Sequence, residues 1–352
     1  MHVVTEFGRR GKVQTVHHGG AREHCVGVHV NAEELASFQR ELHRSSGSPL
    51  MQFVFGNGIT LPESIRWPIT SITSEGSGEV RCATQVIAVI GPAVRNIRDA
   101  GGIIGRAYAD DDAEYCYLGG ISPLDPSQSR EAQARSVFER IESALAQVDM
   151  NFTHVARTWL YLDRLLDWYG EFNAVRTTFF RERGVFNKMV PASTGIGAAS
   201  PRGAAVMAGA IAIRPRSDRT RIFAVQSPLQ CPAIDYRSSF SRAVEIVRSG
   251  GRQLWISGTA SIASDGTSAH VGDIDRQIEL TMKVIHAILH SRRMDWQNTT
   301  RAIAYFRNAT DIPLFQTWCK RHGLRDFPVV YFPSTVCREE LLFEVELDAA
   351  GI

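Results

Sequence analysis

Trp255-Ile256-Ser257-Gly258-Thr259-Ala260 and Tyr117-Leu118-Gly119-Gly120-Ile121-Ser122 are two versions of one pattern, an apolar strand that runs into a glycine turn. Each is followed by a long stretch with apolar residues at steps of three and four, which predicts a helix packed by one face on a sheet. Each stretch contains a glutamine, Gln133 in the first and Gln277 in the second. A recurrence at such long spacing indicates a duplicated structural unit.

The repeat continues beyond the helices. Residues 155–162 and 300–306 read as strands, with Arg157 and Arg301 at matching positions. Each is followed by a second helix, a turn with the sequence Pro-x-Ser-Thr (191–194) or Pro-Ser-Thr (333–335), and a final strand. We therefore predict an α+β fold of two tandem β-α-β units. Their mixed sheets would be backed by helices and would pack against each other as subunits of an oligomer do, with a ligand cleft between them.

The predicted domain limits follow from the repeat. Residues 1–50 mix turn residues, histidines and one short amphipathic stretch, and we expect a peripheral extension there. The first unit is predicted at 51–216 and the second at 217–352. The link between them falls in the Arg-, Pro-, Ser- and Asp-rich residues 214–220, a composition typical of a linker.

Composition narrows the class of protein. The 352 residues are 44% hydrophobic and 22% charged, values of an ordinary globular chain. The net charge of +2 argues against nucleic-acid binding. The absence of a long apolar run or a signal pattern argues against a membrane span and predicts a cytoplasmic protein. Six widely spaced cysteines suggest free thiols. His17, His18, His24 and Cys25 match no strong zinc-ligand spacing, and the sequence contains no nucleotide-binding motif, so we expect neither a metal nor a cofactor.

Two segments contain candidate functional residues. Pro191-Ala192-Ser193-Thr194-Gly195-Ile196-Gly197 is rich in hydroxyl groups and glycines, so as a loop it could offer donors to an anion. Residues 337–347 alternate with period two, which places Glu344 and Glu346 on one face of a strand. The alternation alone favours a solvated outer face. The first unit carries no carboxylate at the matching positions 207–212, as expected if only one of two duplicated sites stayed active.

Arginines near the expected cleft are candidates for binding carboxylates, because a guanidinium group matches a carboxylate bidentately. Arg157, Arg214 and Arg307 lie at or next to strands and turns that would line it. Tyr161, at a strand position matched by Tyr305, is a further candidate lining residue, although a tyrosine at such a position is usually part of the core.

The second unit resembles the reactive-intermediate (imine) deaminases in its Tyr236-Arg237-Ser238-Ser239-Phe240-Ser241-Arg242-Ala243-Val244 segment and in Phe343-Glu344-Val345-Glu346. It lacks the arginine that these enzymes carry at the Ser334-Thr335 turn. From about residue 50 onward the chain is more similar to the chorismatases, a fused double version of that fold. The motifs of this similarity are Arg157-Thr158-Trp159-Leu160-Tyr161, Asp167-Trp168-Tyr169 with Phe172-Asn173-x-x-Arg176, the 191–197 segment and Gly258-Thr259-Ala260-Ser261-Ile262.

The resemblance implies an enzyme that cleaves the enolpyruvyl ether of chorismate without a metal or cofactor, with Glu344 as general acid. A cysteine seven residues before the glutamate, here Cys337, and a glycine, here Gly258, imply the subtype that forms 3-hydroxybenzoate intramolecularly through an arene oxide. The hydrolytic subtype, which gives a dihydroxycyclohexadiene carboxylate, has alanine in place of the glycine. Arg157, Arg214 and Arg307 would hold the two carboxylates of the substrate, with Ser193, Thr194 and Gly195 as further donors.

Other interpretations stay open from the sequence. A third chorismatase subtype yields both 3- and 4-hydroxybenzoate and is not separable here from the second. An imine deaminase and a non-catalytic small-ligand sensor are more distant alternatives. The chain could be a monomer that mimics an oligomer, or it could form a homotrimer.

Overall fold

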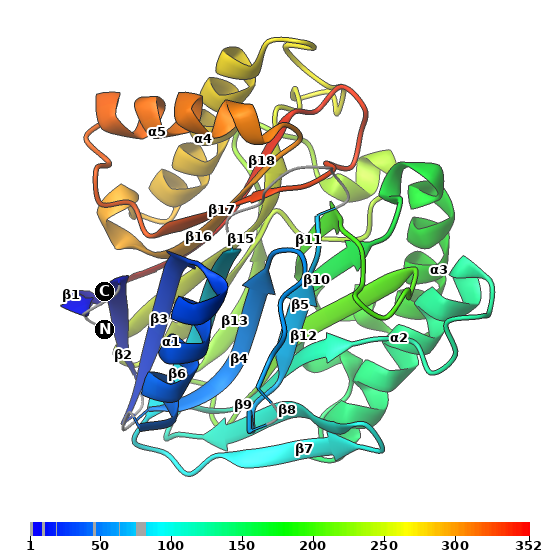
Figure 1. Ribbon diagram of the computed structural model, residues 1–352, viewed down its shortest axis with the longest axis vertical. Helices are drawn as coiled ribbons and strands as arrows, with labels where there is room; N and C mark the ends of the chain where they lie inside the picture. The colour runs from blue at the N-terminus through cyan, green and yellow to red at the C-terminus, as the bar shows by residue number, and fades with distance from the viewer. Residues whose placement is uncertain (1–2, 9–10, 19, 45–46, 63, 75–81) are drawn as a thin grey trace.

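The computed structural model describes residues 3–8, 11–18, 20–44, 47–62, 64–74 and 82–352, and these form three six-stranded sheets (Figure 1). Each sheet has the same strand order. With the strands of a sheet numbered along the chain, their order in space is 1-2-3-6-4-5 in all three. The fourth and fifth strands of each sheet pair in parallel and the others are antiparallel, so the sheets are mixed. The predicted α+β class is confirmed, and a third unit joins the two that the sequence repeat revealed.

Among the described residues, the first unit contains one α-helix, and the other two contain two α-helices each. Its elements are β1 (Val3–Gly8), β2 (Gly11–His18), β3 (Ala21–Val30), α1 (Ala32–Arg44), β4 (Ser48–Phe55), β5 (Ile69–Ile72) and β6 (Cys82–Ile90). The second unit comprises β7 (Arg95–Asp99), β8 (Gly102–Ala109), β9 (Ala113–Ile121), α2 (Arg130–Ala146), β10 (Val155–Leu162), α3 (Tyr169–Glu182), β11 (Ala192–Gly197) and β12 (Val206–Pro215). The third comprises β13 (Arg221–Val225), β14 (Ala243–Arg248), β15 (Gly251–Ala260), α4 (Ile274–Ser291), β16 (Thr299–Phe306), α5 (Ile312–Arg321), β17 (Val329–Pro333) and β18 (Phe343–Gly351).

The N-terminal region differs from the predicted extension. Strands β1, β2 and β3 lie in the same sheet as β4, β5 and β6, so the predicted boundary at residue 50 falls inside β4. The sheet buries apolar side chains such as Val28 and Val54 against Phe38 of α1, which gives these residues a core of their own. The second and third units meet between β12 and β13, within the residues 214–220 proposed as the link.

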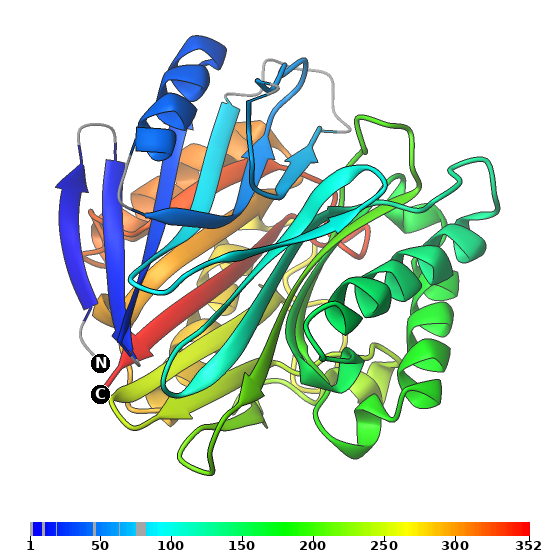
Figure 2. The same cartoon turned by 90° about the horizontal axis from the view of Figure 1, so that it is seen from below.

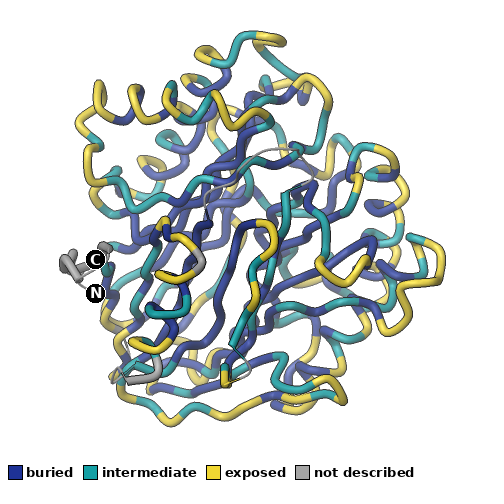
Figure 3. Tube along the Cα trace, viewed as in Figure 1, coloured by how far each residue is buried: buried dark blue, intermediate teal, exposed yellow. Residues whose placement is uncertain are grey.

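The three sheets turn one face toward a shared core, and the helices cover the opposite faces on three sides of the molecule (Figures 1 and 2). Phe53, Trp159 and Tyr305, one from each unit, belong to this shared core. Separate apolar clusters pack α1, α2 with α3, and α4 with α5 onto their own sheets. The strands in the middle of the molecule are buried accordingly (Figure 3). Side chains on the sheet faces that are directed at the shared core therefore lie where the units contact one another.

The contacts between successive units repeat. Gly120 of the second unit donates its backbone N–H to Thr70 Oγ1 of the first (3.0 Å), and Gly258 of the third donates to Thr194 Oγ1 of the second (3.1 Å). At the third contact Gly27 faces Val330, whose Cγ1 would lie 3.0 Å from an added Cβ. The three units therefore close around the core in a pseudo-threefold arrangement, with one seam between each pair.

Side chains at the N-cap positions determine where the helices α2 and α4 begin. Ser129 accepts a hydrogen bond from Ala132 N at the start of α2, and Asp273 accepts one from Arg276 N (3.0 Å) at the start of α4, as the sequence predicts for Asp273. Among the described residues, no helix combines the length and the apolarity needed to cross a membrane.

Candidate active site

A cavity of about 1100 Å³ opens at the seam between the second and third units. Its walls come from α3 and β11 of the second unit and from β15, β18 and the segments that precede β14 and β18 in the third. Glu344, Cys337, Gly258, Ser193 and Gly195 all line it. The structure thus brings together, on one cavity, five of the residues that the sequence singled out.

Glu344 lies on the inner face of β18. Its strand is paired on both sides, with β15 and β16, and Phe343, Val345 and Leu347 point toward the helices α4 and α5. The alternate face, which carries Glu344 and Glu346, is therefore directed at the neighbouring units. Both carboxylates are buried, with 4% and 0% of their surface exposed, so the solvated face favoured by the alternation is wrong.

Burial governs the protonation of Glu344. Loss of hydration raises the pKa of its carboxyl group, the negative charge of Glu346 raises it further, and the guanidinium groups of Arg242 and Arg157 lower it by less. The resulting pKa is about 8. Glu344 consequently keeps its proton near neutral pH, where an ordinary glutamate is ionised, and can act as an acid.

Gly258 makes room for that carboxyl group. A Cβ at this position would stand 2.0 Å from Glu344 Oε1 and 3.2 Å from Thr194 Cγ2. Because the distance to Glu344 Oε1 is far below van der Waals contact, an alanine at position 258 would displace the carboxyl group of Glu344 from the position it occupies here. Thr194 holds the same segment of β15 by accepting the Gly258 N–H.

Cys337 lies in the cavity wall on the segment that leads into β18. Burial raises the pKa of its thiol to about 12, and the neighbouring Glu344 adds to the shift, so the thiol is protonated at neutral pH. Arg307 fixes this segment, because its guanidinium donates to the carbonyl oxygens of Leu341 (2.9 Å) and Arg338 (2.7 Å). Arg307 itself supports the wall and does not line the cavity, contrary to its predicted role.

Four other predicted substrate-binding residues lie outside the lining. Thr194 is one of them, because its hydroxyl accepts the Gly258 N–H. Arg157 is fully buried in the core, where it donates to Ile256 O (2.7 Å) and Glu346 Oε2 (3.0 Å). Tyr161 is a core residue of β10 with 2% of its surface exposed. Arg214 pairs with Glu114 and donates to Asp149 O (2.6 Å) at the far end of β12. Strand direction explains the difference for the last three, since these side chains point into the core or away from the seam.

The segment 191–197 also differs from its predicted loop. Residues Ala192–Gly197 form strand β11, which pairs in parallel with β10, so most of its backbone groups are used in the sheet. Ser193 N donates to Ser257 Oγ (2.9 Å) across the seam. The backbone N–H of Ser193 and the hydroxyl group of Thr194 thus hold the second unit to the third beside the cavity.

The cationic groups of the cavity come from arginines that the sequence did not single out. Arg176, Arg242 and Arg338 line it, and the ring of Tyr236 lies between the last two, with guanidinium carbons 5.4 and 5.3 Å from its centre. Arg242 donates to Cys231 O (3.0 and 2.9 Å), and Arg176 donates to Ser238 Oγ (3.1 Å). These contacts hold the guanidinium groups at the rim and wall of the cavity. The sequence could have identified two of these arginines, because Arg176 and Arg242 occur in the motifs that carry the family resemblances.

Comparisons with known proteins agree with this fold. Residues 102–209 match the sequence model of the N-terminal domain of FkbO/Hyg5-like chorismatases. A crystal structure of a chorismatase superposes with a TM-score of 0.67 at 19% identity, covering 93% of this chain and 98% of that one. The chain therefore has the chorismatase fold, and the resemblance to this family is confirmed.

Curated relatives refine the comparison. A 3-hydroxybenzoate synthase of Streptomyces hygroscopicus is 24% identical over 69% of this chain and 75% of its own length. A chorismatase of Streptomyces rapamycinicus is 25% identical over 65% of this chain and 73% of its own. Both similarities extend well beyond residues 102–209, so the relationship covers most of the three-unit chain.

Proposed function

We propose that this protein cleaves the enolpyruvyl ether of chorismate to pyruvate and 3-hydroxybenzoate, with Glu344 as the general acid. The observation that carries the proposal is a buried carboxyl group with a pKa of about 8 on a cavity lined by arginines. Chorismate combines an acid-sensitive enol ether with two carboxylates, and the two features of the cavity match these two parts. The name of the 3-hydroxybenzoate synthase relative supports the choice of product.

The reaction needs one proton on carbon. Glu344 would donate its proton to the methylene carbon of the enolpyruvyl group, which turns the ether into an oxocarbenium ion. The bond between the ring carbon and the ether oxygen would then break, with its electron pair going to the departing pyruvate. The neighbouring ring hydroxyl would attack that carbon and return its proton to Glu344, forming an arene oxide. The arene oxide opens to 3-hydroxybenzoate, and the Cys337 thiol would assist the final proton movement. No water is consumed.

The substrate carboxylates would be held by the arginines of the cavity. Arg176, Arg242 and Arg338 are suited to this role because each is anchored by a carbonyl or hydroxyl group and faces the same space as Glu344. Pre-positioned guanidinium groups bind carboxylates at less cost in side-chain entropy.

We propose that the enzyme acts in the cytoplasm and that it is a monomer. All six cysteines, which lie in the described part of the chain, are free, as a reducing compartment keeps them. The three units already enclose their shared core within one chain. Sedimentation that gave a stable species of three chains would contradict the monomer.

The direct test incubates the purified chain with chorismate alone, with neither metal nor cofactor added, and separates the products by chromatography. We expect pyruvate and 3-hydroxybenzoate in equal amounts. A dihydroxycyclohexadiene carboxylate would retain the cleavage and reject the intramolecular route. Saturable binding of chorismate without pyruvate would reject the enzyme and favour a ligand sensor.

The pH dependence of the reaction follows from the protonation of Glu344. Because only the protonated acid can donate, kcat/KM should fall about tenfold per pH unit above a pH of about 8. Below that value the acid stays protonated, so this group imposes no loss at neutral pH. Initial rates of pyruvate release between pH 5 and 10 measure the profile. A decline that begins near pH 5, as for a solvated glutamate, would reject this assignment.

Gly258→Ala tests the contact with Glu344. The new methyl group would stand 2.0 Å from Glu344 Oε1, so the carboxyl group must move and the proton it delivers must arrive from a different place. We expect a lower rate and a product mixture shifted from 3-hydroxybenzoate toward the dihydroxycyclohexadiene carboxylate, measured by chromatography. Gly170→Ala, on the same cavity but with no atom within 4 Å of an added Cβ, is the matched control. An unchanged product ratio in Gly258→Ala would remove this glycine from control of the reaction.

Cys337→Ala tests the thiol. If Cys337 moves the proton during aromatisation, pyruvate release should continue while the fraction of 3-hydroxybenzoate falls. Cys231→Ala, which replaces another free cysteine of the third unit, serves as the control. A Cys337→Ala variant that still forms 3-hydroxybenzoate alone would exclude the thiol from the mechanism.

A further inference from the structure

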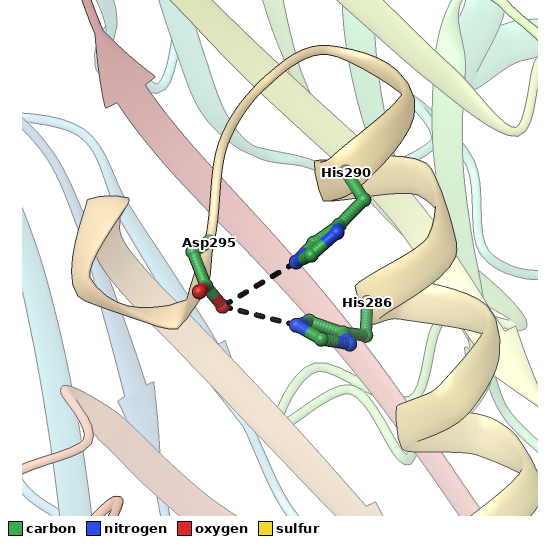
Figure 4. A group of neighbouring side chains, drawn as sticks. All are labelled: His286, His290 and Asp295. Atoms are coloured by element: carbon green, nitrogen blue, oxygen red, sulfur yellow. Dashed lines mark hydrogen bonds and ion pairs between the residues drawn. The ribbon is translucent and has the colours of Figure 1, made fainter.

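Three side chains on the outer side of the third unit converge on one point, away from the catalytic cavity (Figure 4). His286 and His290 lie one turn apart on α4, and Asp295 lies in the turn that follows this helix. Their ligand-type atoms all lie within 4.8 Å of one another. None of the three lines the cavity that holds Glu344.

The distances suit a metal ion. Asp295 Oδ1 lies 3.0 Å from His286 Nε2 and 3.8 Å from His290 Nε2. Ligand atoms at 2.0–2.2 Å from a tetrahedral zinc ion are about 3.4 Å apart. The two observed distances bracket this value, so an ion can enter with small rotations of the side chains.

The surroundings fix two of the three groups. The ring of His286 stacks on Trp296, with centres 4.9 Å apart and planes 6° from parallel. Asp295 caps the short helix Trp296–Asn298, because its carboxylate accepts the Trp296 N–H (2.7 Å) and its own N–H donates to Asn298 Oδ1 (2.9 Å). Since these contacts hold the groups in place, little side-chain entropy remains to be lost on binding an ion.

The second unit provides an internal comparison. With Gln133 aligned to Gln277, the positions of His286, His290 and Asp295 are occupied there by Glu142, Ala146 and Asn151. Asn151 makes the same cap as Asp295, and Glu142 forms an ion pair with Arg183. The fold at this corner of the second unit therefore forms with neither the histidine pair nor the aspartate charge, so the cap alone does not account for the three groups of the third unit.

We propose that His286, His290 and Asp295 bind one divalent transition-metal ion of the zinc class. Two imidazole nitrogens and a carboxylate oxygen are donors that zinc prefers, and water would complete the tetrahedron. The ion fastens the last turn of α4 to the segment that leads into β16, the strand that carries Arg301. Its role is structural, because the site has no contact with the catalytic cavity.

The test uses Zn²⁺ alone, added to chelator-treated protein and followed by isothermal titration. We expect one Zn²⁺ per chain for the wild type and an affinity lower by at least about tenfold for His290→Ala, since even loss of an outer partner costs that much. His290→Ala installs the residue of the second unit, and Asp295→Asn keeps the cap while removing the charge, so both variants should fold. His322→Ala, a histidine stacked on Trp318 in the next helix, is the control and should bind Zn²⁺ as the wild type does.

Independent readouts separate this site from binding elsewhere. Zn²⁺ should raise the melting temperature of the wild type and not that of His290→Ala. Electron paramagnetic resonance of bound Cu²⁺ should show two imidazole nitrogens in the wild type and one in His290→Ala. The proposal would be overturned if the wild type bound no Zn²⁺, or if His290→Ala and Asp295→Asn bound Zn²⁺ as tightly as the wild type does. Either result would leave only a hydrogen bond between His286 and Asp295.

Discussion

Glu344→Gln should lower kcat for pyruvate release from chorismate by about 10²–10⁴-fold, the usual contribution of a positioned general acid. An amide of the same shape fills the space beside Gly258 but cannot give a proton to carbon. Binding of chorismate should change little, because the arginines of the cavity are untouched. Steady-state rates and equilibrium binding of the substrate measure the two effects separately.

The matched control is Glu339→Gln, which removes an exposed carboxylate from the segment preceding β18 and should retain the wild-type rate.

The pH dependence of the free energy of unfolding provides a second test of Glu344. The folded state binds the Glu344 proton up to a pH of about 8, the unfolded chain only up to about 4.5, so this group makes the wild type less stable as pH rises between these values. Glu344→Gln should lack that decline in urea unfolding. A variant with normal turnover would reject Glu344 as the acid.

Glu346→Gln should lower the free energy of unfolding by about 3–5 kcal/mol, the usual result of removing one partner from a buried ion pair. Glu346 is fully buried and accepts from Arg301 Nη2 (2.5 Å), Arg157 Nη2 (3.0 Å) and Trp159 Nε1 (2.8 Å). These guanidinium groups keep the pKa of Glu346 below its ordinary value despite burial. Without the carboxylate, Arg157 is left as a charge in the core. Urea unfolding at neutral pH measures the loss.

Glu142→Gln is the control for this prediction, because the Glu142–Arg183 pair is about one-third exposed and should contribute no more than about 1 kcal/mol. Glu346→Gln should also change the pH dependence of kcat/KM. The charge of Glu346 helps to raise the pKa of Glu344, so its removal should move the alkaline limb of kcat/KM to lower pH. Equal destabilisation by the two substitutions, with an unshifted limb, would contradict the role given to the buried carboxylate.

The sequence repeat located the second and third units and missed the first. Their long amphipathic helices and matching strands repeat closely enough to be aligned residue by residue. The predicted limits 51–216 also included β4, β5 and β6, which belong to the sheet of the first unit. In the part of the first unit that the structure describes there is a single α-helix, and β5 spans only Ile69–Ile72. Its inner face packs on the other two units, so its fold depends on contacts that no local pattern records.

The active-site residues were likewise predicted only in part. Glu344, Cys337 and Gly258 follow from their positions in motifs, and all three line the cavity. The predicted arginines do not line the cavity, because nearness to a seam in sequence does not fix where a side chain points. Arg157 points into the core, whereas Arg242 reaches the cavity from the segment before β14. Such directions depend on the pairing of strands from different units.

Joining three like units in one chain frees each seam to evolve alone. In a homotrimer a substitution appears at all three interfaces at once. Here the strand registers place Met207 of the second unit where the third carries Glu344, and Val330 occupies the place of Thr194 at another seam. An acid whose burial weakens the fold is therefore needed only once, while the other two seams are free to accumulate apolar, stabilising residues. Because the three units are parts of one chain, one seam can carry the acid while the other two differ from it, whereas exact symmetry would keep all three identical.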